Sequence, residues 1–162
     1  TLGDELLHGY LCIAAGAAHI GKRIPTETLV DVCKTFHGKV VIVGGNDDIE
    51  VGNTLAGIAP DRIFNEAGKR SIHASASIIR QSSVVLAGDT GMMHIAAAFK
   101  RPLVSVWGCT VPELGMSPYG DFENIILEPK NLSKRPCSKL GDRCKYEKTG
   151  RCITHTSQLQ KF

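Results

Sequence analysis

A strand, a loop and a helix follow one another in Val84-Val85-Leu86-Ala87-Gly88-Asp89-Thr90-Gly91-Met92-Met93-His94-Ile95-Ala96-Ala97-Ala98-Phe99. The first four residues are typical of a short buried strand. Asp89 or Thr90 suits a helix N-cap, and Gly91 lets a ligand approach the N–H groups of the first turn. The stretch predicts a strand over 84–87, a helix over 92–99 and room for a diphosphate between them. The simpler alternative is an ordinary capped helix with a packed histidine.

The same alternation of short apolar runs and longer amphipathic stretches extends over most of the chain. It predicts further strands at 10–14, 39–43, 62–64, 103–107 and 124–127, and further helices at 25–36 and 71–81. Another helix is predicted to end near 58, with residues 46–48 as its cap and first turn. The β-branched run 39–43 is typical of a strand buried on both faces. The expected fold is a Rossmann-like, three-layer α/β/α domain with a mostly parallel sheet, over residues 1–128. Residues 129–162 lack apolar periodicity and predict a loop-rich carboxyl-terminal extension that contains cysteines.

Length, composition and charge restrict the class of protein. The chain has 162 residues, of which 43% are hydrophobic and 22% charged, as in a globular domain with one core. Its formal charge is only +3, and its basic residues are scattered except for a modest concentration between Lys130 and Arg151, so nucleic acid is not the expected partner. No apolar run reaches the roughly 20 residues that span a bilayer, and the first residues do not resemble a signal peptide. We therefore expect a cytoplasmic location.

Three loops follow predicted strands, and ligands of open α/β sheets bind where such loops converge. The first loop, 15–23, has small residues at Gly16 and Ala17 and a lysine, Lys22, that can neutralise a phosphate. The second is 88–94, described above. The third is 108–113, where the Thr110 hydroxyl can donate to a phosphate.

The first loop also fits a second pattern. Residues 16–22 satisfy G-x-x-x-x-G-K, the phosphate-binding loop of nucleotide triphosphatases. That motif needs Ser or Thr after the lysine, but Arg23 stands there, and Pro25 places the helix start too late. A divergent phosphate-loop nucleotide binder is therefore an alternative and not the leading hypothesis.

Two longer runs carry a more specific signature. Residues 88–98 and residues 101–112 together closely resemble the ADP-heptose:lipopolysaccharide heptosyltransferases, glycosyltransferase family 9. Gly16-Ala17, Lys22-Arg23 and Pro25 are similar to the first loop of that family, and the likeness includes 65–69, so it spans about 9–120.

The resemblance implies one half of a GT-B fold, the carboxyl-terminal domain that binds the nucleotide-sugar donor, here expected to be ADP-heptose. It implies that Lys22 and the backbone of Thr90 and Gly91 contact the donor diphosphate. It also implies that Asp89 accepts hydrogen bonds from sugar hydroxyls and that His94 supports the phosphate side. An acid after the second strand would hold the ribose, with three candidates, of which Glu50 is favoured over Asp47 and Asp48. The full set of expected donor-binding residues is Gly16, Ala17, Lys22, Glu50, Asp89, Thr90, Gly91, His94 and Thr110.

The reaction implied by the family is inverting glycosyl transfer without a metal, in lipopolysaccharide or surface-glycan synthesis. The catalytic base belongs to the amino-terminal acceptor domain in that family, so we expect no catalytic residue here and no turnover by this chain alone. The implied partners are a nucleotide-sugar donor and a glycan or lipid-linked acceptor, with peripheral contact of the full enzyme at the inner face of the inner membrane. The rival hypothesis from another class is a nucleotide-binding module without transferase activity.

Three cysteines of the predicted extension, Cys137, Cys144 and Cys152, precede His155 and have the ligand types of a zinc site. Structural zinc sites usually begin with close cysteine pairs, whereas here the cysteines are widely spaced. Zinc is therefore not expected, and the alternative is a set of reduced cysteines in an irregular tail.

Overall fold

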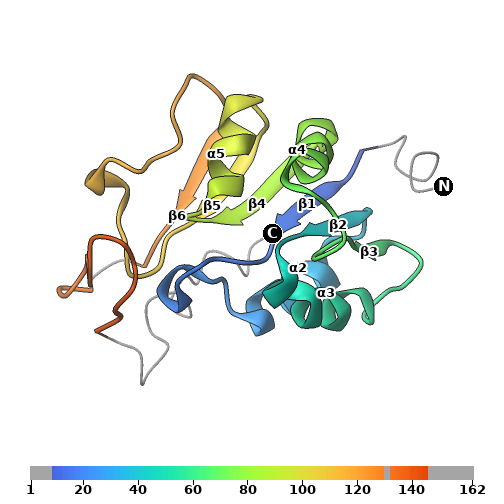
Figure 1. Cartoon of the computed structure of the whole chain (residues 1–162), viewed down its shortest axis with the longest axis horizontal. Helices are drawn as coiled ribbons and strands as arrows, with labels where there is room; N and C mark the ends of the chain where they lie inside the picture. Colours follow the sequence, from blue (N-terminus) through green and yellow to red (C-terminus); the bar gives the residue numbers. More distant parts are fainter. Residues whose placement is uncertain (1–8, 130–131, 146–162) are drawn as a thin grey trace.

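The computed structural model describes residues 9–129 and 132–145. Within them lies a six-stranded sheet in the order β3-β2-β1-β4-β5-β6 (Figure 1). Every pair of neighbouring strands is parallel. This confirms the predicted Rossmann-like α/β fold. The strands are β1 (Leu11–Ala14), β2 (Val40–Val43), β3 (Ile63–Asn65), β4 (Val84–Gly88), β5 (Leu103–Val106) and β6 (Asn124–Leu127).

Helices cover both faces of this sheet, as a parallel sheet requires. Figure 1 shows α2 and α3 on one face and α4 and α5 on the other. Their bounds are α2 (Thr26–Thr35), α3 (Ile49–Ala56), α4 (Ile72–Gln81) and α5 (Gly91–Ala98). Three short 3₁₀ turns, η1 (Ile20–Lys22), η2 (Asn46–Asp48) and η3 (Pro112–Leu114), lie in the loops that follow β1, β2 and β5.

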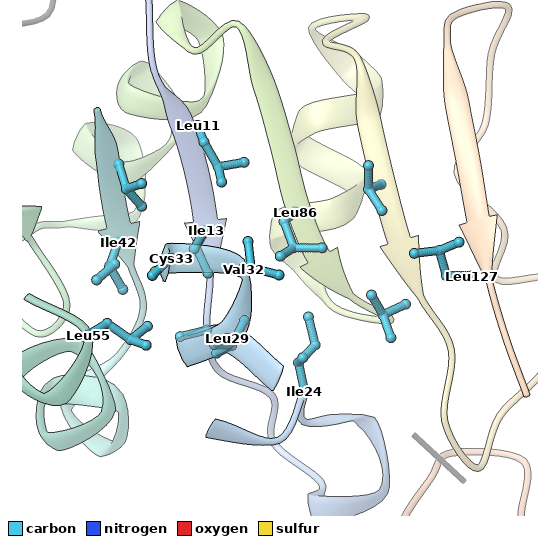
Figure 2. Close-up of a cluster of buried hydrophobic side chains, with 14 of the residues drawn as sticks. Leu11, Ile13, Ile24, Leu29, Val32, Cys33, Ile42, Leu55, Leu86 and Leu127 are labelled. Carbon is cyan, nitrogen blue, oxygen red and sulfur yellow. The ribbon is translucent and has the colours of Figure 1, made fainter. Parts of the chain in front are cut away.

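The core has two halves, one on each face of the sheet. In Figure 2, Leu29 and Val32 of α2 lie over side chains of the central strands, including Ile13 and Leu86. On the opposite face Ile79 of α4 and residues of α5 pack against the alternate strand residues, together with Trp107. Successive strand residues point to opposite faces, so the uninterrupted apolar run of β2 supplies both halves of the core.

The elements match the predicted ones within one or two residues, except after β2. Residues 46–48 were predicted as the cap and first turn of a helix that ends near 58. They form the separate 3₁₀ turn η2, and α3 starts at Ile49 with Asp48 as its N-cap residue. The cause is local: the Asp48 carboxylate accepts a hydrogen bond from the Gly45 N–H at 2.8 Å. This bond closes a tight turn and carries Asp48 inward, where it is buried.

Residues 132–145 form neither helix nor strand, but they pack on the domain. Cys137 belongs to the core cluster, and its N–H donates to the Cys109 carbonyl at 2.8 Å. Among the helices of the described residues, none is long and apolar enough to cross a membrane.

Candidate functional site

Because the strands are parallel, their carboxyl ends meet at one edge of the sheet, and the loops after β1, β2 and β4 converge there. Connections from β1 to β2 and from β3 to β4 run toward opposite sides, so β1 and β4 flank the topological switch point where α/β proteins bind ligands. A pocket of about 260 Å³ lies at this point. Its lining comes from all three loops and α5: Ala14, Gly16, Ala17, Ala18, Arg23, Val43, Gly44, Gly45, Asp47, Asp48, Thr90 and Met92.

Asp48 lies between the loops that follow β1 and β2. A Cβ atom at Gly16 or at Gly44 would collide with its side chain, so both positions need glycine for the carboxylate to fit. The predicted small-residue character of the first loop therefore has a definite cause. The absence of a side chain at Gly16 makes room for the Asp48 carboxylate at the edge of the pocket.

The N-terminus of α5 forms another side of the pocket. Thr90 is the N-cap residue, yet its hydroxyl caps no N–H, and its buried Oγ1 has no hydrogen-bond partner among the described residues. Next to it Gly91 is exposed, and a Cβ there would meet no atom of the described chain within 4 Å. The Met93 N–H already donates to the Thr90 carbonyl at 3.1 Å, so the start of α5 at Thr90 and Gly91 is the part open to a ligand at the positive end of the helix dipole.

Beside the pocket, Lys22 and Asp89 form an ion pair with 2.7 Å between Nζ and Oδ2. The Thr110 hydroxyl donates to the same carboxylate oxygen at 2.8 Å. Asp89 is 4% exposed and Thr110 is fully buried, so the carboxylate is held by two donors in a site nearly closed to water. The three residues come from the loops after β1, β4 and β5, and the sequence predicted each of them as a site residue without predicting their contact.

Two predicted site residues lie elsewhere on the surface. Glu50 is exposed on α3, and the pocket lining contains Asp47 and Asp48 in its place. His94 is exposed on the first turn of α5 and is not among the lining residues. Of the other predicted residues, Gly16, Ala17 and Thr90 line the pocket itself.

Arg23 is a pocket residue that the sequence reasoning did not assign to the site. Its Nε donates to the Ala17 carbonyl at 2.9 Å, which closes the first loop on itself. The signal was present in the Lys22-Arg23 pair, which is part of the resemblance to the first loop of the family, but only Lys22 was predicted to bind the donor. The geometry also departs from that motif, because Lys22 ends a 3₁₀ turn and α2 begins only at Thr26.

The cysteines of the extension lie partly outside the described residues. Cys137 and Cys144 are described, whereas Cys152 and His155 are not. No group of three or more metal-ligating side chains occurs among the residues that the structure describes. A second, larger hollow of about 940 Å³ lies over 137–145, but one segment alone lines it, in contrast to the pocket at the switch point.

Comparison with known proteins is consistent with this architecture. The sequence model of glycosyltransferase family 9 (heptosyltransferase) matches residues 4–148. This chain belongs to glycosyltransferase family 9. The predicted resemblance to heptosyltransferases is therefore confirmed.

Two curated members of family 9 show how much of the protein the chain represents. It is 33% identical to lipooligosaccharide heptosyltransferase 2 of Haemophilus influenzae over 148 residues. This alignment covers 86% of the present chain and 42% of the relative. It is also 33% identical to lipopolysaccharide heptosyltransferase 2 of Escherichia coli K12, over 46% of this chain and 23% of the relative. The chain thus spans less than half the length of these relatives.

Solved structures of family 9 share the fold. The structure of E. coli ADP-heptose lps heptosyltransferase II superposes with a TM-score of 0.71 at 20% identity, over 94% of this chain and 45% of that one. A family 9 glycosyltransferase from Veillonella parvula gives a TM-score of 0.66 at 23% identity, over 75% and 35% of the two chains.

Proposed function

We propose that this chain is the donor-binding domain of a family 9 glycosyltransferase and that it binds a nucleotide-activated heptose, with ADP-heptose as the expected donor. The observation that carries the proposal is the convergence of three loops at the switch point of the sheet. They bring together a pocket, an open helix N-terminus and the Lys22–Asp89 pair. A diphosphate needs positive charge and N–H donors, and this edge of the sheet offers both.

We assign each group a role in binding the donor. Lys22 and the backbone N–H groups at Thr90 and Gly91 bind the diphosphate. Asp89, held by Lys22 and Thr110, accepts hydrogen bonds from sugar hydroxyls. Asp47 and Asp48 line the pocket, so one of these acids is better placed than Glu50 to hold the ribose.

The proposed reaction is inverting transfer. An acceptor hydroxyl loses its proton to a carboxylate base and forms a bond to the anomeric carbon, while the bond from that carbon to the nucleoside diphosphate breaks. The base belongs to the amino-terminal domain of the family that the sequence resembles. The residues described here would stabilise the leaving diphosphate, where negative charge develops, and this mode of stabilisation needs no metal ion.

The wider setting follows from the family. The solved structures related in fold include the E. coli heptosyltransferase WaaC with ADP and with ADP-2-deoxy-2-fluoro heptose. We extend this donor chemistry to the present chain, with a lipid-linked glycan as acceptor in lipopolysaccharide or other surface-glycan synthesis. From the same resemblance we propose that the full enzyme acts in the cytoplasm, at the inner face of the inner membrane.

Calorimetric titration of the 162-residue chain with ADP, UDP, GDP and CDP tests this function. We expect saturable binding of one nucleotide, with ADP favoured. In Lys22→Ala the affinity should fall by about tenfold or more, because a charge-assisted contact to phosphate is lost. Lys34→Ala is the matched control, since Lys34 is exposed in the last turn of α2. Absence of binding to all four nucleotides, or equal affinity in the Lys22→Ala variant, would contradict the proposal.

A further inference from the structure

Residues 132–145 lie against the loops of the candidate site, although they are far from them in sequence. In Figure 1 this orange to red segment runs close to the blue loop that follows β1. The Cys109 N–H donates to the Gly21 carbonyl at 3.0 Å, and the Cys137 N–H donates to the Cys109 carbonyl at 2.8 Å. Backbone hydrogen bonds thus join the first loop, the loop after β5 and the segment 132–145 in one row.

Arg135 anchors this segment. Its side chain is 7% exposed and donates to three carbonyl oxygens, those of Gly108 (2.7 Å), Thr110 (2.9 Å) and Pro129 (2.9 Å). It also pairs with Glu128 at 3.0 Å. The planar guanidinium fork makes several bonds in fixed directions, so Arg135 fixes the backbone of the residue whose hydroxyl holds Asp89.

Gly141 reaches Lys22 from the other side. Its φ is +81°, and a Cβ there would come within 2.7 Å of Lys22 Cε, 2.9 Å of Cγ and 3.2 Å of Cδ. The Lys22 stem therefore lies directly against the Gly141 backbone. The Gly141 carbonyl accepts from the Cys109 Sγ at 3.7 Å, which ties this contact to the loop after β5.

We propose that the segment 132–145 is part of the donor site, with Arg135 and Gly141 as positioning residues. Gly141 supplies the surface that holds the Lys22 side chain on Asp89, and Arg135 fixes the Thr110 side of the same carboxylate. The expected effect of these residues on donor binding rests on the proposed donor-binding function. Their effect on the position of the Lys22 side chain does not depend on that function.

The main test compares Gly141→Ala with Gly115→Ala. Both glycines have nearly equal positive φ, +81° and +84°, so alanine strains the backbone similarly at the two positions. At Gly115 a Cβ meets no described atom within 4 Å, whereas at Gly141 it meets the Lys22 stem. The pair of variants separates displacement of Lys22 from backbone strain.

The first readout needs no ligand. The Lys22 amine is labelled with an acetylating reagent in competition with exposed Lys100, and the ratio is measured by mass spectrometry. We expect Gly141→Ala to raise the labelling rate of Lys22 severalfold, because its ammonium leaves the nearly closed pair with Asp89, and Gly115→Ala to leave it unchanged. Equal rates in the two variants overturn the inference, whether or not the chain binds nucleotide.

The second readout is the affinity for ADP and for inorganic pyrophosphate, in single variants and in the Lys22→Ala background. We expect Gly141→Ala to weaken binding by about tenfold and to have no further effect once Lys22 is removed. If Lys22→Ala weakens binding but Gly141→Ala does not, the result contradicts the inference and leaves the proposed function standing. A chain that binds neither probe contradicts the proposed function alone, and the labelling experiment then decides the inference.

Arg135→Lys provides an independent variant if Gly141→Ala fails to fold. Lysine keeps the charge but cannot reach three carbonyls in the geometry of the fork. We expect faster Lys22 labelling in Arg135→Lys and no change in Arg143→Lys, because Arg143 is exposed and pairs with its neighbour Asp142. Unchanged labelling in folded Arg135→Lys removes Arg135 from the proposal.

Discussion

Lys22 and Asp89 show how residue roles predicted separately become one unit. The sequence predicted a contact to phosphate for the first and to sugar hydroxyls for the second. In the structure they neutralise each other at 2.7 Å, and Thr110 stabilises the same carboxylate. A diphosphate that contacts Lys22 therefore also acts on the partner of Asp89. Substitution of either residue should affect the other, so their effects on binding should not be additive.

Cys12 carries a prediction about pH. It lies fully buried in β1, and burial raises the pKa of its thiol from 9.0 to about 12. Below pH 9 the thiol is protonated in both the folded and the unfolded chain, so titration of Cys12 does not lower the free energy of unfolding there. Above pH 9 only the unfolded chain loses this proton, so the contribution of Cys12 to the free energy of unfolding falls by about 1.4 kcal/mol per pH unit until pH 12.

Urea denaturation under reducing conditions at pH 7, 8, 9.5 and 10.5 measures this effect. We expect the free energy of unfolding of Cys12→Ala to fall less steeply above pH 9 than that of the wild type. Between pH 7 and 8 the two proteins should show the same slope, which serves as the internal control. Identical slopes above pH 9 would show that Cys12 does not stay protonated in the folded chain.

At the scale of elements, Arg62 joins the end of one helix to the start of a strand. It precedes β3, and its guanidinium donates to the carbonyls of Cys33 (2.7 Å), Phe36 (2.8 Å) and Gly38 (3.2 Å). The first two belong to the C-terminal end of α2, where carbonyl groups have no partner within the helix. A cation also interacts favourably with the negative end of the helix dipole.

Arg62→Ala should therefore lower the free energy of unfolding by about 1–3 kcal/mol, since several charge-assisted hydrogen bonds are lost at once. Thermal or urea denaturation measures the change. The matched control is Arg80→Ala, because Arg80 is exposed in the last turn of α4. A change no larger than that of the control would mean that water replaces Arg62 at these carbonyls without cost.

At the scale of the whole molecule, binding and turnover should separate. We expect the 162-residue chain to bind nucleotide but to transfer no sugar to a lipopolysaccharide acceptor. The reason is that we propose the base to lie in an amino-terminal domain. A coupled assay of nucleoside diphosphate release, with a full-length family 9 heptosyltransferase as positive control, measures this. Transfer above the rate without protein would overturn the assignment of the base.

The sequence alone determined the fold, and it predicted the edge of the sheet where the candidate site lies. Apolar periodicity is a local property, so it predicted all six strands within about two residues, and β-branched runs predicted a parallel sheet buried on both faces. Strand ends followed by glycine-containing loops then fixed the edge where Gly16, Ala17 and Thr90 meet. The start of α3 was the exception, because a side chain, Asp48, bonds back to the Gly45 N–H and tightens the turn.

Only the tertiary structure decided which side chains of these loops touch. Lys22 and Asp89 are 67 positions apart, and no local pattern records that they pair. Glu50 and Asp47 are both exposed and differ by their position along one turn, yet only Asp47 lines the pocket. Residues 132–145 have no periodicity, so their contacts through Arg135 and Gly141 were invisible to sequence reasoning. Local structure follows from neighbouring residues, whereas the geometry of the site follows from how distant segments pack.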